Sequence, residues 1–137
     1  MADAIPDLWP DIEQTQVVPP IAILRQQAAA LAKKTNYLLQ GQVETITTSG
    51  GRFTHSFNVV APSLDNYTYK LFWIEHGAEQ YPVVAPTPET GLSTRPLPRT
   101  LTIESQDDLL DYIREVLNSD KTKKIVSSLL AQVKATT

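Results

Sequence analysis

Residues 42–85 read QVETITTSGGRFTHSFNVVAPSLDNYTYKLFWIEHGAEQYPVVA, and this stretch decides the fold. It is rich in threonine, valine, isoleucine and aromatic residues, which favour strands. Turn signals interrupt it, among them Ser49-Gly50-Gly51 and the polar segment 61–66. Strands are predicted over 42–48, 52–60, 67–76 and 81–85. Their short connections predict an antiparallel meander.

Two of these strands carry further information about their places in the sheet. Leu71 to Ile74 are all apolar, which predicts a central strand covered on both faces at that end. Pro82 lacks a backbone donor, so strand 81–85 is predicted at an edge. After a proline-rich loop over 86–99, a short strand over 100–104 is predicted to return to the sheet.

Helical patterns lie on either side of the meander. One begins near Pro20, a residue suited to a first helical turn, and Gly41 is predicted to follow its C-cap with a positive φ. A second begins after Ser105, with Asp108 in the capping-box position. The run 118–120 predicts a stop and a new N-cap, although one long bent helix is the alternative. The fold class is therefore α+β, with an N-terminal helix, a meander of four to five strands and two C-terminal helices.

Residues 1–18 are predicted to form an extended arm, and residues 19–137 a single domain. Pro6 and Pro10 oppose a regular helix in the arm, yet Leu8, Trp9 and Ile12 are apolar. One interpretation is that the arm lies across its own domain and buries these side chains. The other is that it docks onto another protein or a second copy of the chain, with Trp9 as an anchor.

Composition limits the class of protein. A chain of 137 residues with 42% hydrophobic and 20% charged residues is typical of one globular domain. The absence of cysteine excludes disulfides, thiolate catalysis and cysteine-bound metal. The first helical pattern contains Arg25 and Lys33, which oppose a membrane span. Asp3 and Asp7 oppose a signal peptide, so a soluble cytoplasmic protein is expected.

The net charge of -3 is unevenly distributed. Residues 1–18 contain four acids and no base, whereas the last helix is basic. Because nucleic-acid binding needs a concentrated cationic face, nucleic acid is an unlikely partner. Stacking of single-stranded bases on Tyr67 and Tyr69 beside Lys70 is the weakest of the alternatives.

The chain shows no pattern of residues typical of catalysis. His55 alternates with Phe53 and Phe57, which favours a hydrogen-bonded core histidine, whereas His76 ends a strand, where sites are more frequent. Two histidines are too few for a zinc site, so neither a metal nor a cofactor is expected. Converging carboxylates, a nucleophile elbow and a phosphate loop are also missing from the sequence. The chain is therefore predicted not to be an enzyme.

A pocket on the sheet is the main alternative to a protein-binding role. Phe53, Phe57 and Trp73 are predicted to line it, and an arginine of the 86–99 loop would grip an anion. The candidate ligand-binding residues are His55, Tyr69, His76, Arg95 and Arg99.

The leading hypothesis is a non-catalytic protein-interaction protein that acts through its surface and its arm. An adaptor, a chaperone-like holder and an inhibitor or immunity factor all fit this description. The expected partner is another protein or a second copy in a homodimer, and the candidate partner-binding residues are Leu8, Trp9 and Ile12.

Overall fold

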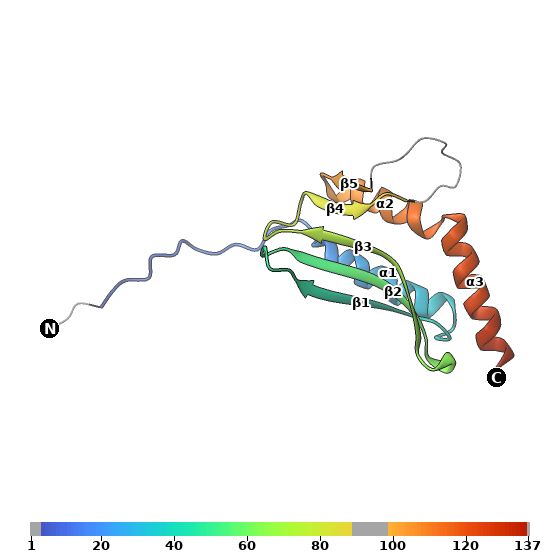
Figure 1. The fold of residues 1–137 in the computed structure, drawn as a ribbon. Coiled ribbons are helices and arrows are strands. Elements are labelled where there is room, and N and C mark those ends of the chain that lie inside the picture. Colours follow the sequence, from blue (N-terminus) through green and yellow to red (C-terminus); the bar gives the residue numbers. More distant parts are fainter. Residues whose placement is uncertain (1–3, 89–98, 137) are drawn as a thin grey trace.

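The computed structural model describes residues 4–88 and 99–136 (Figure 1). The elements follow the order α1 (Pro20–Lys34), β1 (Gln40–Thr47), β2 (Phe53–Ala61), the 3-10 turn η1 (Pro62–Leu64), β3 (Tyr67–His76), β4 (Val83–Pro86), β5 (Thr100–Ile103), α2 (Gln106–Leu117) and α3 (Asp120–Ala135). The predicted α+β class is confirmed. Over the described residues, the meander contains five strands, and two separate helices follow it.

The strands form one antiparallel sheet in the order β1-β2-β3-β4-β5. The long strand β3 is central, as predicted. The prediction that the strand after Tyr81 lies at an edge is wrong, because β4 pairs with β3 on one side and β5 on the other. Pro82 precedes β4, so its missing donor removes no hydrogen bond from the ladder.

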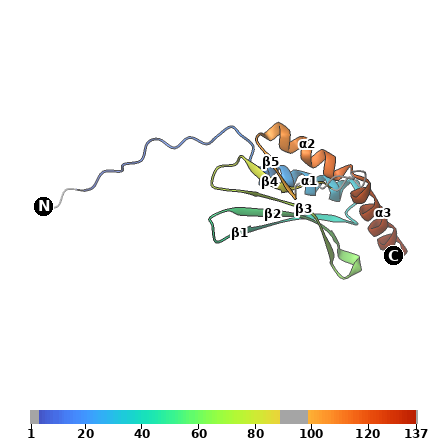
Figure 2. The same ribbon diagram turned by 45° about the horizontal axis from the view of Figure 1, so that its top comes forward.

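The helices lie on one side of the sheet (Figure 2). Phe72 and Ile74 point to this side and are buried. Trp73 pairs with Ser56 and, because side chains alternate along a strand, points to the opposite side, where it is half-buried. The prediction that β3 is covered on both faces is therefore wrong for the described residues, since none of their helices packs behind Trp73.

The end of α1 differs from the prediction. The helix closes with Thr35 as its C-cap, and the left-handed conformations belong to Asn36 and Tyr37, at φ 52° and 65°. Gly41 instead lies in β1, facing Ala28. A Cβ on Gly41 would stand 2.4 Å from the Ala28 Cα. Glycine is needed there because helix and strand approach so closely, and not because of a positive φ.

The core consists of two hydrophobic clusters. The first joins α1 and α2 to the sheet and includes Leu24, Phe57 and Leu109. The second lies under α3 and includes Val59 and Val133. Leu71 packs against both clusters and is only half-buried. The seam between the two clusters therefore crosses the middle of the sheet.

The C-terminal helices are separated by local capping. The Ser105 hydroxyl accepts a hydrogen bond from the Asp108 backbone N–H at 3.2 Å, which confirms the predicted start of α2. Ser119 caps α3 in the same way through Thr122, also at 3.2 Å. The prediction of a stop and a new cap is thus confirmed, and α2 and α3 change direction between them (Figure 1).

Candidate functional site

The N-terminal arm projects away from the domain (Figures 1 and 2). Its large apolar side chains are open to solvent, with Leu8 82%, Trp9 77% and Ile12 76% exposed. The interpretation that the arm buries these side chains on its own domain is therefore wrong. The three candidate partner-binding residues lie on one continuous exposed segment.

Local hydrogen bonds shape the arm and attach its base. The Asp7 carboxylate accepts a bond from the Trp9 N–H at 3.0 Å, which is the Asx-type turn that Asp favours. At the base, the Val18 N–H donates to the Gln106 side chain at 3.4 Å, and the Val18 side chain packs on the first cluster. The arm is thus attached to the domain at Val18, beside the start of α2.

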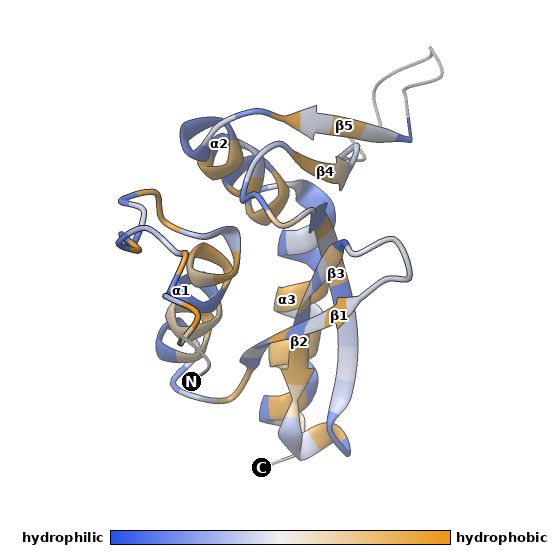
Figure 3. Ribbon diagram, turned by 90° about the vertical axis from the view of Figure 1, so that its left-hand side faces the viewer, coloured by the Kyte–Doolittle hydropathy of each residue, from blue (hydrophilic) through white to orange (hydrophobic). Residues whose placement is uncertain are grey.

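A groove opens along the seam between the two clusters. Figure 3 shows α1 and α2 on the same side of the sheet, with α1 beside the β1–β2 hairpin and α2 beside β4 and β5. The space between them is a cavity of about 480 Å³, within the size range of binding sites. Its floor consists of Phe57, Val59 and Leu71.

The walls of the groove are apolar and its rim is cationic. Leu31 of α1, Leu110 and Leu117 of α2 and Val126 of α3 line the walls and are only half-buried. The charged lining residues are Lys34, Arg114 and Lys123, and none of the described residues that line the cavity is acidic. Asp111 forms an exposed ion pair with Arg114 at 2.9 Å, which is a weak interaction in water. The groove thus presents an apolar trough with positive charge along its edge.

Sequence reasoning missed this groove. Its lining comes from three helices and two strands, and the apolar residues on each helix read as ordinary core positions. No local signal marks the groove, because the space between helices is not encoded in any one of them.

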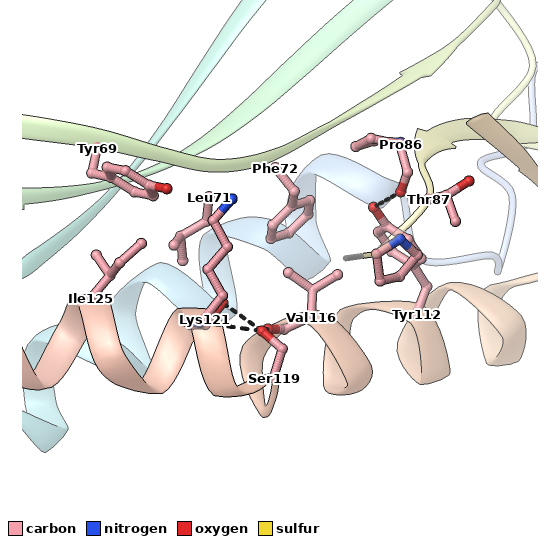
Figure 4. Close-up of a pocket in the computed structure, with 12 residues that line it drawn as sticks. Tyr69, Leu71, Phe72, Pro86, Thr87, Tyr112, Val116, Ser119, Lys121 and Ile125 are labelled. Carbon is pink, nitrogen blue, oxygen red and sulfur yellow. Dashed lines mark hydrogen bonds between the residues drawn. The ribbon is translucent and has the colours of Figure 1, made fainter. Parts of the chain in front are cut away.

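A smaller cavity of about 140 Å³ lies between β3, β4 and the α2–α3 junction. Figure 4 shows Tyr69 and Ile125 at one end of it and Tyr112 at the other. The Tyr112 hydroxyl donates to the Pro86 carbonyl at 2.6 Å, and burial raises the pKa of Tyr112. This cavity lies between the sheet and the helices, and its volume is that of only a few water molecules.

The two histidines meet on the helix-facing side of the sheet. His55 and His76 are buried, and their Nε2 atoms are 2.9 Å apart. His76 Nδ1 lies 2.7 Å from the Gly77 carbonyl, and His55 Nδ1 lies 2.8 Å from the Thr45 hydroxyl. The pair thus connects β1, β2 and β3 through a chain of hydrogen bonds.

The hydrogen-bond partners of His55 and His76 determine which tautomer each ring adopts. A carbonyl only accepts, so His76 Nδ1 carries a proton and, in the neutral ring, His76 Nε2 accepts from His55 Nε2. His55 Nδ1 then accepts from Thr45. Burial, followed by the charges of His76 and Arg25, lowers the pKa of His55 from 6.5 to about 4. His55 is therefore the hydrogen-bonded core histidine that the alternation predicted, and His76 is its partner.

The other candidate ligand-binding residues do not gather around these histidines. Tyr69 lines the small cavity, and with Tyr67 it also lines a shallow hollow against α3. Lys70 pairs with Asn58 and so points to the opposite face from Tyr69. Arg99 is exposed at the start of β5, whereas Arg95 lies outside the described residues.

Comparisons with known proteins found no matching family model, no matching curated protein and no matching solved structure. Over the described part of the chain, no cluster of three or more His, Cys, Asp or Glu side chains is arranged to hold a metal ion. Among the described helices, none has both the length and the apolar character needed to cross a bilayer.

Proposed function

We propose that this chain is a non-catalytic protein-interaction protein whose N-terminal arm binds another polypeptide through Leu8, Trp9 and Ile12. The observation that carries the proposal is the exposure of these side chains, which ranges from 76% to 82%. An apolar surface of this kind marks an interaction site, because burying it against a partner removes it from water.

The chemistry of the arm supports a polypeptide partner. Tryptophan buries a large area and loses few rotamers, which explains its frequency at binding hot spots. The acids Asp7, Asp11 and Glu13 lie between the apolar residues, and residues 4–18 contain no base. The arm therefore combines apolar anchors with negative charge, which together select a partner with apolar pockets and a basic rim.

The alternative of a small-ligand pocket has less support. Trp73 points to the opposite face from His55 and Phe57, so the residues proposed to line that pocket are divided between the two sides of the sheet. Tyr69 and His55 line no common cavity among those described for residues 4–88 and 99–136. The nucleic-acid alternative is weakened similarly, because Lys70 and Tyr69 lie on different faces.

Photo-crosslinking in the cells that naturally produce the protein tests the proposal. A photoreactive amino acid replaces Leu8 in one variant and Thr48, at the β1–β2 turn, in the matched control. We expect a discrete crosslinked polypeptide from position 8 and none from position 48. Trp9→Ala in the same chain should weaken the crosslink, because it removes the main anchor.

Absence of any crosslink from position 8, with the protein folded and present at its normal level, would contradict the proposal. Equal crosslinking from position 48 would also contradict it, because the arm would then have no special role.

A further inference from the structure

We propose that the groove between α1 and the α2–α3 pair is the binding site for the N-terminal arm of a second copy of this chain, so that two copies exchange arms. This inference rests on the proposed function of the arm and identifies its partner. It follows from the shape of the groove, its charge and the point at which the arm leaves the domain.

Charge complementarity is the first argument. The arm carries Asp7, Asp11 and Glu13 without a base over residues 4–18. The groove carries Lys34, Arg114 and Lys123, and the described residues that line it include no acid. Neither Lys34 nor Lys123 forms an ion pair within the described residues. Opposite potentials of this kind orient a partner and exclude like-charged competitors.

Apolar complementarity is the second argument. The arm exposes Ile5, Leu8, Trp9 and Ile12, and the groove offers half-buried leucines over a floor that includes Phe57. A volume of about 480 Å³ accommodates the indole of Trp9 together with one or two aliphatic side chains. Docking would remove the exposed side chains of the arm and the half-buried wall residues of the groove from water.

The direction of the arm is the argument for a second copy. The arm leaves the domain at Val18, next to the starts of α1 and α2. The groove lies along the later parts of the same helices, from Gln27 to Lys34 and from Leu110 to Asn118. Pro19 is extended, at φ -62° and ψ 145°, and the arm continues away from the domain (Figure 1). Docking within one chain would therefore require a reversal just before two consecutive prolines, whose φ is restricted.

The reach of the arm is sufficient for exchange. Residues 4–18 span up to about 50 Å when extended, whereas α1 with its 15 residues is about 22 Å long. An arm that leaves one domain can thus pass along the helices of a neighbouring copy. Each copy supplies one arm and one groove, so a reciprocal exchange about a two-fold axis fills both grooves in a closed symmetric dimer.

A charge-swap experiment by native mass spectrometry tests this arrangement. The arm variant combines Asp11→Lys with Glu13→Lys, and the groove variant combines Lys34→Glu with Lys123→Glu. Each variant alone should be at least tenfold weaker as a dimer than the original chain, because arm and groove then carry like charges. Mixing the two should restore a heterodimer, since every arm then meets a groove of opposite charge.

Two controls keep the result specific. Lys33→Glu with Lys124→Glu makes the same charge change at exposed neighbouring positions that do not line the groove, and it should leave the dimer unchanged. Trp9→Ala should weaken the dimer at least about tenfold, and its circular dichroism should match that of the original chain, because Trp9 contributes nothing to the core.

Three results would overturn the proposal. These are a monomeric original chain of 15.2 kDa at all concentrations, a charge-swap mixture that forms no heterodimer, and a groove variant that dimerises normally. The chain could instead crosslink from position 8 to a different protein and remain monomeric by native mass spectrometry. That combination would reject arm exchange and leave the proposed function intact. No crosslink and no dimer would reject both.

Discussion

Gly41 is the residue at which α1 and the sheet come closest. An added Cβ would meet the Ala28 Cα at 2.4 Å and the Ala28 Cβ at 2.6 Å. Gly41→Ala should therefore lower the free energy of unfolding by about 2 kcal/mol or more, because helix and strand must move apart. Urea unfolding followed by circular dichroism measures this change.

Gly50→Ala is the matched control for that substitution. Nothing lies within 4 Å of a Cβ at Gly50, and its φ is not positive, so the free energy of unfolding should change by less than about 0.5 kcal/mol. Equal effects of the two substitutions would show that the contact between Gly41 and Ala28 is not close-packed.

His55 gives the protein a defined dependence of stability on pH. Its pKa is lowered to about 4 in the folded protein, from 6.5, so between these values the unfolded chain binds more protons than the folded one. Stability is therefore fully present above pH 6.5 and decreases as the pH falls toward 4. At about 1.4 kcal/mol per pH unit, the loss is about 2 kcal/mol by pH 5.

NMR titration of the His55 ring, together with urea midpoints at pH 7 and pH 5, measures this effect. His55→Gln removes the titrating group, so its midpoint should change less between the two pH values than that of the original chain. A His55 pKa of 6 or higher would contradict the burial of the His55 ring, which is the main cause of the lowered pKa.

At the scale of the elements, Ser119 keeps α2 and α3 separate. Its hydroxyl accepts from the Thr122 N–H at 3.2 Å and donates to the Val116 carbonyl at 2.8 Å. Ser119→Ala should lower the free energy of unfolding by about 1 kcal/mol, the usual cost of a lost N-cap. Thermal unfolding followed by circular dichroism measures the change.

Ser128→Ala serves as the comparison within the same helix. Ser128 is exposed in the interior of α3, where alanine has the higher helix propensity, so stability should stay constant or rise slightly. A larger loss at Ser128 than at Ser119 would contradict the capping role.

At the scale of the whole molecule, the described arm residues 4–17 contribute no side chain to either hydrophobic cluster. Removal of residues 1–17 should therefore leave the stability of the monomer within about 0.5 kcal/mol and the denaturant slope unchanged, since that slope follows the surface exposed on unfolding. Removal of residues 1–24 should unfold the domain, because it also deletes the buried Ile23 and Leu24. Unfolding of the shorter truncation would show that the arm packs on its own domain.

Much of the fold was predictable from local sequence. The caps at Ser105 and Ser119, the turn at Ser49-Gly50-Gly51 and the apolar run in β3 all act through neighbouring residues. The class, the order of the elements and the break between α2 and α3 therefore followed from the chain itself. The apolar residues of the arm were visible in sequence among prolines, but their exposure was not, because the sequence also allowed them to be buried on the domain.

The tertiary structure decided the rest, because it depends on contacts between residues distant in the chain. Gly41 is required by Ala28 on another element, and β4 became an interior strand only through pairing with β5. The groove exists because α1 and α2 cover different strands and leave Phe57, Val59 and Leu71 between them. The sequence thus determined which elements form, by local propensity and capping. Their spacing, and with it the groove, was decided by how side chains of different elements fill the space above one sheet.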